Sequence, residues 1–130
     1  MSKVVSFLNE AKMFFFATVE NDQPRVRPFG ASMSYNGKVY MSTNNQNHAY
    51  QQFLKNPKVE VCGVANGQWL RVTGNAVVDD TMEARKAMFA ANPFLERNYS
   101  PEDETLSVFY LDNMKALLYG HGSAPTELED

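Results

Sequence analysis

A tight hairpin signal constrains the fold of this chain more than any other feature of its sequence. Asn36-Gly37 stands between two runs that are predicted to be strands, Arg25–Tyr35 and Lys38–Thr43. Both central residues of a type I′ turn need a positive φ, which asparagine and glycine adopt at low cost. A two-residue turn of this kind joins antiparallel neighbours, so the sheet must be at least partly antiparallel.

Further strands follow the same pattern of short apolar runs bounded by turn residues. A second hairpin turns at Gly67. The remaining strands are predicted over Met13–Glu20, Val59–Asn66, Gln68–Asp79, Leu106–Leu111 and Lys115–Tyr119. About six antiparallel strands with a few short helices indicate a mainly β (α+β) fold, and a small barrel is favoured because closure removes exposed edges.

Three short helices are expected beside these strands. The first opens the chain after Ser2, a residue type that caps helices. The second ends at Asn56-Pro57, because proline disfavours helical geometry in the preceding residue. The third begins at Asp80, which forms an acidic variant of the capping box with Glu83. No repeat or linker interrupts the pattern, so residues 1–130 are expected to form a single domain.

Composition and charge argue against several classes of protein. The 130 residues carry a net charge of −3, which disfavours a general nucleic-acid binder. No apolar run approaches the ~20 residues of a membrane span, and the stretch from Met13 to Ala17 is too short for the core of a signal peptide. The single cysteine, Cys62, allows no internal disulfide, which fits a reducing cytoplasm. With only His48 and His121 beside it, we expect no metal site.

The predicted strand from Gln68 to Asp79 has an unusual outer face. Its even positions are apolar and define the core side, and they alternate with Trp69, Arg71 and Thr73. A large aromatic residue beside an arginine is typical of a subunit interface, where both types are enriched. The same face is alternatively the wall of a ligand site, with Trp69 packing on a flat ring system. The two interpretations are compatible if the ligand lies at the interface.

Arg27 shares its alternation face with Phe29 and Met33, so a permanent cation points along a largely apolar surface. An unpaired buried guanidinium is costly, so it needs an anionic partner. A bound anion, an internal ion pair and a surface arginine all stay open. Pro28 lacks a backbone N–H, which places this segment at a sheet edge or a bulge. The first 95 residues hold ten Lys+Arg against seven Asp+Glu, so an anionic ligand is expected in that part of the chain.

The segment from Ser42 to His48 joins a strand to the start of a helix. Helix N-termini offer free N–H groups and a partial positive charge, and Thr43 and Asn44 add hydrogen-bond donors, so a phosphate would be stabilised here. Asparagine and threonine are also ordinary turn and N-cap residues, which is the simpler interpretation of the segment alone. Together with Arg27, however, the segment is expected to form a phosphate-binding pair on two hairpin-linked strands.

Four motifs follow one another along the chain. They are Pro24-Arg25-Val26-Arg27-Pro28-Phe29-Gly30, Ser42-Thr43-Asn44-Asn45, Asn56-Pro57 and Gly67-Gln68-Trp69-Leu70-Arg71-Val72-Thr73-Gly74. Their order and spacing resemble the flavin-binding split-barrel family related to pyridoxamine 5′-phosphate oxidase, and the first and last are most similar to its nitroimidazole-reductase-like branch. The resemblance extends from about Lys3 to Tyr119. It implies that the chain folds as a six-stranded antiparallel split β-barrel. It also implies that two chains form a homodimer, with two FMN molecules at the subunit interface.

The resemblance also implies which residues meet the cofactor. Arg27 falls at the position of a phosphate-binding arginine, and Trp69 at that of a glutamine beside the isoalloxazine. The expected cofactor-binding residues are Arg27, Pro28, Phe29, Gly30, Ser42, Thr43, Asn44, Asn47, His48, Trp69 and Arg71. His48 and Ala49 replace an arginine and a lysine of the oxidase, and Ser32 replaces a substrate-binding lysine, so oxidation of pyridoxamine phosphate is not expected. F420 and haem, used by other branches, are alternative cofactors.

We therefore expect a cytoplasmic, FMN-dependent oxidoreductase that reduces a small planar or electron-poor compound with a nicotinamide donor. No catalytic residue is assigned, because the sequence reveals no acid–base pair and hydride transfer at a flavin depends on positioning. The alternative is a binding module that holds a flavin or haem without turnover. A third interpretation is a barrel around an apolar ligand, with Arg27 paired internally. None of these involves nucleic acid or a membrane.

Overall fold

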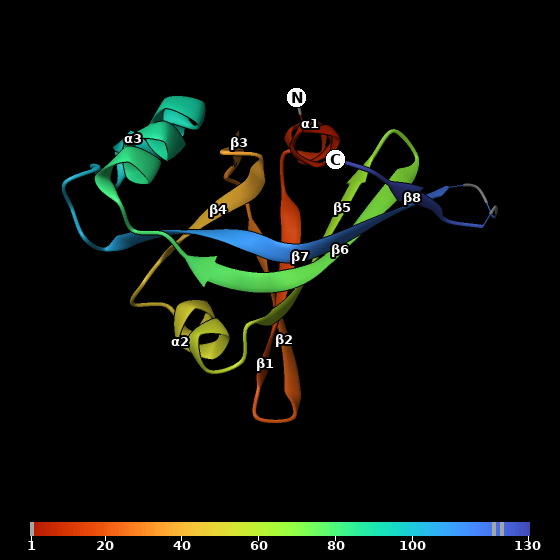
Figure 1. Cartoon of the computed structure of the whole chain (residues 1–130), viewed down its shortest axis with the longest axis horizontal. Helices are drawn as coiled ribbons and strands as arrows, with labels where there is room; N and C mark the ends of the chain where they lie inside the picture. The colour runs from red at the N-terminus through yellow and green to blue at the C-terminus, as the bar shows by residue number, and fades with distance from the viewer. Residues whose placement is uncertain (1, 121, 123) are drawn as a thin grey trace.

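The computed structural model describes residues 2–120, 122 and 124–130. His121, considered above as a metal ligand, lies outside them. An antiparallel sheet dominates the structure, with short helices around it (Figure 1). The helices are α1 (Lys3–Ala11), α2 (His48–Lys55), α3 (Met82–Ala91) and the 3-10 helix η1 (Pro93–Arg97). The strands are β1 (Phe14–Glu20), β2 (Gln23–Phe29), β3 (Ser32–Tyr35), β4 (Lys38–Asn44), β5 (Lys58–Ala65), β6 (Gln68–Val78), β7 (Leu106–Gly120) and β8 (Thr126–Leu128).

Neighbouring strands pair antiparallel in the order β2-β1-β5-β6-β7-β4-β3, and β8 pairs with β7. Asn36 and Gly37 both have a positive φ and join β3 to β4, as predicted. The edge strands β2 and β3 are consecutive in the chain and are joined only through residues 30 and 31. The two edges of the sheet must therefore lie close together, which gives a split barrel. The mainly β (α+β) fold class is confirmed.

The predicted strand over Arg25–Tyr35 is two strands in the structure, at opposite edges of the sheet. Pro24 and Pro28 both lie on the edge strand β2, which has the neighbouring strand β1 on one side. Proline is tolerated on an edge strand, because no strand on its other side needs the missing N–H for a hydrogen bond. The edge position inferred from Pro28 is thus confirmed. The alternation in the sequence predicts one face for Arg27, Phe29 and Met33 and so gives no sign of the break. That prediction is wrong, because Phe29 packs against one core of the protein and Met33 belongs to the other.

The two strands predicted over Leu106–Leu111 and Lys115–Tyr119 are a single strand, β7, with a bulge. Asn113 has a φ of 51°, and the register with β6 shifts at Gly74. A Cβ atom on Gly74 would lie 3.1 Å from the backbone oxygen of Asp112, so the bulge depends on a glycine. Turn-forming residues here mark a bulge and not a strand end. With β8 included, the described residues form eight strands and not the six predicted.

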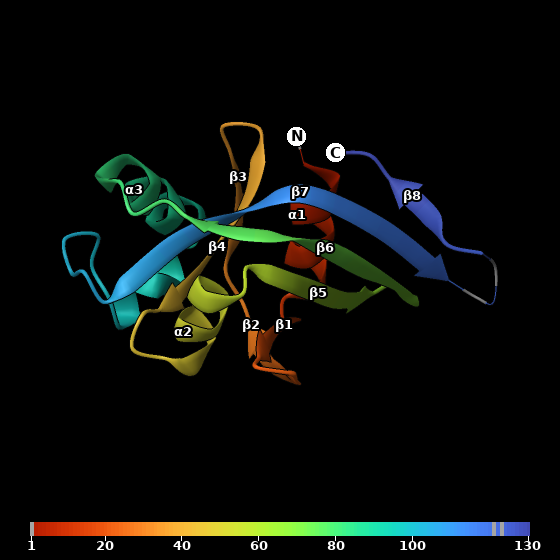
Figure 2. The same cartoon turned by 60° about the horizontal axis from the view of Figure 1, so that its bottom comes forward.

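Different helices cover the two faces of the sheet. On the inner face, Phe16, Val61 and Val72 lie opposite one another and form the main core with residues of α1 and α2. On the opposite side of β3, β4 and β7, a second core forms under α3 around Tyr40 and Met88. The strand β7 runs the length of the molecule, from the α3 end to β8 (Figure 2). None of the helices in the described part of the chain is long and apolar enough to cross a bilayer.

The N-terminal cap of α1 was predicted correctly. Ser2 Oγ accepts a hydrogen bond from Val5 N at 3.0 Å. Asp130, at the other end of the chain, extends this cap by accepting from Val4 N at 3.0 Å and from Ser2 Oγ at 2.7 Å. The two ends of the sequence are therefore held together at the start of α1.

The predicted cap of α3 is wrong by one residue. Thr81, and not Asp80, caps the helix through its side chain, which accepts from Ala84 N at 3.2 Å. Asp80 instead accepts a hydrogen bond from Val108 N on β7 at 3.0 Å. This partner is 28 residues away in the sequence, so no local pattern indicates it.

Candidate functional site

A cavity of about 640 Å³ opens between β2, the end of β4 and the N-terminus of α2. The size lies within the range of ~300–1,000 Å³ that is usual for small-molecule sites. Its lining is mostly polar and consists of Glu20, Arg25, Val26, Arg27, Phe29, Thr43, Gln46, Asn47, His48, Ala49 and Gln52. The cavity therefore suits a polar ligand or the polar end of a larger one.

Arg27 is held at this cavity by three hydrogen bonds, all to neutral oxygen atoms. Its Nη1 donates to the backbone oxygen of Phe16 at 3.1 Å and to Thr18 Oγ1 at 2.9 Å. Its Nη2 donates to Gln52 Oε1 at 2.7 Å. None of the ion pairs among the described residues involves Arg27. Burial lowers the pKa of Arg27, yet a guanidinium stays charged in proteins, so a partly buried positive charge is left without an anion.

Gln52 reaches Arg27 from another element of the fold. It lies on the inner side of α2, beside the buried Ala49 and Phe53, and is only 7% exposed. Its Oε1 accepts hydrogen bonds from both Arg27 and Thr18. A side chain of α2 thus fixes the position of a guanidinium that belongs to β2.

The charges at the cavity are unbalanced. Arg25 is paired with Glu20 at 2.9 Å, so the one carboxylate in the lining is already used. Arg27 and His48 have no carboxylate partner among the described residues that line the cavity. The cavity therefore carries an excess of positive charge next to Arg27, which favours an anionic ligand.

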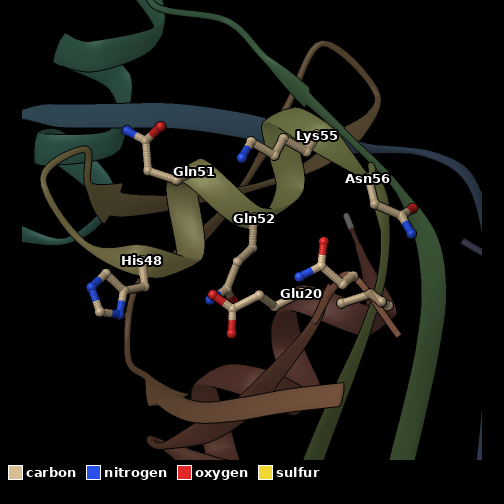
Figure 3. A pocket seen from close by; sticks show the side chains of 8 residues that line it. Glu20, His48, Gln51, Gln52, Lys55 and Asn56 are labelled. Atoms are coloured by element: carbon tan, nitrogen blue, oxygen red, sulfur yellow. The ribbon is translucent and has the colours of Figure 1, made fainter. Parts of the chain in front are cut away.

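A second cavity of about 340 Å³ adjoins the first and shares Glu20, His48 and Gln52 with it. In Figure 3, Gln52 extends from α2 toward the tip of the β1–β2 hairpin, where Glu20 lies. Lys55 lines the same cavity from the last turn of α2. The two cavities form one polar surface along α2.

Five of the eleven predicted site residues line the larger cavity. They are Arg27, Phe29, Thr43, Asn47 and His48. Asn47 is the N-cap residue of α2, but its side chain forms no capping hydrogen bond. Phe29 stacks on Phe16 with ring centroids 4.6 Å apart, so the face of β2 that carries Arg27 also contacts the main core. The cavity thus joins the predicted β2 segment to the start of α2.

The predicted residues near β4 do not all lie at the cavity. Ser42 and Thr43 point to opposite faces of the strand, and Ser42 is buried beside Val108, with its Oγ lacking a hydrogen-bond partner among the described residues. Asn44 donates to Tyr99 Oη at 3.2 Å, outside the lining. Gly30 lies between β2 and β3 and does not line the cavity.

Pro28, Trp69 and Arg71 lie on the other side of the sheet. Pro28 is directly opposite Phe15, and a residue pair of this kind shares one face. Arg71 forms an ion pair with Glu60 at 2.8 Å. As predicted, Trp69 and Arg71 therefore point away from the core, but one chain alone does not bring them to Arg27.

Gln52 and Arg25 belong to the cavity and were missed. Gln52 could have been found from the helical spacing, because it lies between the apolar positions Ala49 and Phe53 on the buried side of the helix. A polar residue on such a face usually has a specific partner. Arg25 lies two residues before Arg27 and so points to the same face of β2.

A bare apolar surface, here called the outer face, is formed by Phe15, Val26, Val64 and Trp69. Register places these side chains on one side of β2, β1, β5 and β6, and all four are exposed, with Val26 at 68%. Trp69 stacks on Tyr119 with ring centroids 4.0 Å apart and 9° between the planes. Val26 also lines the larger cavity, so the cavity and the outer face meet at β2.

Comparison with solved structures identifies proteins that share this architecture. A NimC/NimA family protein from Clostridium acetobutylicum is 36% identical, with a TM-score of 0.92, covering 97% of this chain and 89% of that one. A pyridoxamine 5′-phosphate oxidase-related, FMN-binding protein from Nostoc punctiforme shares the fold at 16% identity and a TM-score of 0.65, covering 98% and 95%. A haem-binding protein from Mycobacterium smegmatis does so at 14% and 0.71, covering 94% of this chain and 54% of that one.

One of the two sequence comparisons, the scan against family models, agrees with the structural comparison. The search of curated proteins finds no match. The sequence model of the pyridoxamine 5′-phosphate oxidase family matches residues 1–117, which is most of the chain. Together with the split barrel and the 36% identity to a NimC/NimA protein, this match shows that the chain belongs to the pyridoxamine 5′-phosphate oxidase family, on the side of its nitroimidazole-reductase-like branch.

Proposed function

We propose that this protein is a cytoplasmic, homodimeric, FMN-dependent oxidoreductase that reduces small planar or electron-poor organic compounds with a nicotinamide donor. The observation that carries the proposal is the charge of Arg27. It is partly buried at a cavity, and all three of its hydrogen bonds go to neutral acceptors. A cation in this setting is stabilised by a bound anion, and the phosphate of FMN is an anion of suitable size.

The residues around Arg27 fit a phosphate group. Thr43 and Asn47 supply a hydroxyl and an amide that line the same cavity, and the first turn of α2 supplies free backbone N–H groups. The helix dipole favours negative charge at this end. Arg27, Thr43, Asn47 and the start of α2 would therefore hold the phosphate.

The outer face supports a dimer as the functional form. Exposed apolar patches rimmed by polar groups mark interaction sites, and here Arg71 and Glu60 stand beside Trp69. A two-fold axis would pack this face against the same face of a second copy. Because Val26 belongs to both the cavity and the outer face, a second copy would cover the mouth of the cavity and bring its own Trp69 toward it.

The residues of this chain position the reactants and leave the redox chemistry to the cofactor. FMN supplies hydride acceptance and donation when it is bound. Phe29 and the adjacent backbone of β2 would support the ring, and the dimer interface would exclude water from it. No side chain is assigned to proton transfer, because hydride transfer at a flavin depends on positioning. The shape and flatness of the compound that reaches the ring would determine substrate specificity.

The absorbance spectrum of the purified protein, alone and after addition of FMN, tests the proposal. A yellow protein with a flavin spectrum, which then oxidises NADH or NADPH in the presence of a nitro compound or a quinone, is the expected result. A protein that stays colourless and does not retain added FMN would contradict it.

A non-catalytic haem- or flavin-binding module is the second candidate. It is favoured by His48, which lines the cavity and offers an imidazole to a haem iron. The same spectrum separates the two, because haem, flavin and the deazaflavin F420 absorb differently. Bound flavin without any turnover of NADH or NADPH would favour the binding module over the enzyme.

A further inference from the structure

The feature that carries a further inference is the contact between Gln52 and Arg27. Gln52 is buried, and its Oε1 lies 2.7 Å from Arg27 Nη2. Arginine has only donors, so this hydrogen bond determines that the oxygen of the amide, and not its nitrogen, faces Arg27. Gln52 Nε2 therefore points away from the guanidinium, and it forms no hydrogen bond with the rest of the described chain.

We propose that Gln52 is the residue that makes this site selective for a phosphorylated flavin over a neutral one. It positions the Arg27 guanidinium without neutralising it, so that the charge remains available to the ligand. The inference rests on the proposed function, because it assigns a role within the same cofactor site. Gln52 acts through Arg27 and is a positioning residue.

The physical reason lies in the difference between an amide and a carboxylate of the same shape. A carboxylate at the position of Gln52 would form a charge-assisted pair with Arg27 at hydrogen-bond distance. The pair would be largely shielded from solvent, since Gln52 is buried and Arg27 is partly buried. The carboxylate would then neutralise the positive charge of Arg27 inside the protein, and a bound phosphate would contact a neutral ion pair.

The neighbouring charges do not replace Arg27 in this role. Arg25 is already paired with Glu20, and His48 carries an imidazole, which is not a permanent cation as a guanidinium is. Lys55 lines only the adjoining cavity. The net charge that a phosphate meets thus depends on what holds Arg27.

The variant Gln52→Glu tests the proposal by titration with FMN and with riboflavin, which has the same ring and no phosphate. The wild-type protein should prefer FMN. The variant should bind FMN about 10–100-fold more weakly, with riboflavin affinity changed less than about threefold. Asn98→Asp is the matched control, because it makes the same change from amide to carboxylate at an exposed position after η1 that lines neither cavity, and its FMN affinity should stay near the wild-type value.

Each other outcome has a definite meaning. FMN affinity unchanged in Gln52→Glu overturns the inference and leaves the proposed function intact. Equal losses for FMN and riboflavin also overturn it, because they indicate a structural role. A wild-type protein that binds FMN no better than riboflavin contradicts the phosphate site itself. If Gln52→Glu fails to fold, Gln52→Met takes its place: a loss confined to FMN supports the inference, and any other pattern overturns it.

Discussion

Arg27 and Trp69 lie on opposite faces of one sheet, on strands β2 and β6 that are separated by β1 and β5. Register connects Arg27 through Phe16 and Val61 to Val72, whose side chain is in the core. Trp69 is three residues from Val72 and therefore points to the opposite side. The strands β2 and β6 are three strand spacings apart, which amounts to roughly 14 Å. Within one chain, the sheet therefore separates the two side chains, and the proposed dimer would bring Trp69 of a second copy to the cavity.

Replacing Arg27 by alanine should weaken FMN binding about 10–100-fold, because a charge-assisted hydrogen bond of ~1.5–3 kcal/mol is lost. Riboflavin affinity should not change, since riboflavin has no phosphate. Fluorescence titration measures both. Arg97→Ala, which removes an exposed arginine on η1 outside the cavity, is the control. A variant that loses folding stability but keeps its FMN affinity would favour the purely structural interpretation of Arg27.

Replacing Trp69 by aspartate should convert a dimer into a monomer, because the substitution places a charge in place of the largest side chain of the apolar outer face. Sedimentation velocity at micromolar concentration measures the change. Phe94→Asp offers a matched control: Phe94 is exposed to a similar degree, 45% against 39% for Trp69, but lies on η1. Identical oligomeric states for wild type and Trp69→Asp would exclude this face as the interface.

Replacing Tyr40 by phenylalanine should lower the free energy of unfolding by about 1–2 kcal/mol near neutral pH. Tyr40 Oη donates to Asp79 Oδ2 at 2.8 Å in the second core. Burial alone would raise the pKa of Asp79, but hydrogen bonds from Tyr40 and Thr81 outweigh it and hold this pKa below the usual 3.8. The ionised carboxylate therefore stabilises the fold above that value, and this contribution is lost as the pH falls through the lowered pKa.

The stability difference between wild type and Tyr40→Phe should accordingly shrink in acid. Urea unfolding at about pH 7 and about pH 3 measures it. Tyr110→Phe is the control, because the Tyr110 ring contacts that of Tyr40 at a centroid distance of 5.3 Å but none of the described hydrogen bonds uses its hydroxyl. A difference that stays constant with pH would show that Asp79 is not the group responsible.

Replacing Asp130 by alanine should destabilise the protein by about 0.5–2 kcal/mol, since two hydrogen bonds at the start of α1 are lost. Thermal unfolding measures the effect, and amide exchange should locate it in the first turn of α1. Glu129→Ala, next to it and exposed, should have little effect. Equal stabilities of the two variants would mean that Asp130 adds nothing to the cap supplied by Ser2.

Local patterns predicted much of this fold and part of its site. The Asn36-Gly37 turn and the alternation over Gln68–Asp79 indicated antiparallel pairing and the side of Trp69, because both are properties of a few neighbouring residues. The cavity joins Arg27 to the 42–48 segment through Thr43, Asn47 and His48. The expected hairpin link between their strands is wrong, because Arg27 lies on β2 and the Asn36-Gly37 turn joins β3 to β4. Ser42 does not line the cavity, because adjacent strand residues point to opposite faces and Thr43 is the one that faces it.

The sequence by itself determined the type of sheet, its hairpins and the family motifs, since turn geometry and side-chain alternation act over short distances. Only the tertiary structure decided that Arg25–Tyr35 divides between two edges of the sheet and that Gln52 holds Arg27. These outcomes depend on contacts between residues far apart in the chain, whose energies no local pattern contains. The charge left at Arg27 is of this kind: it depends on which neutral groups the fold packs around it.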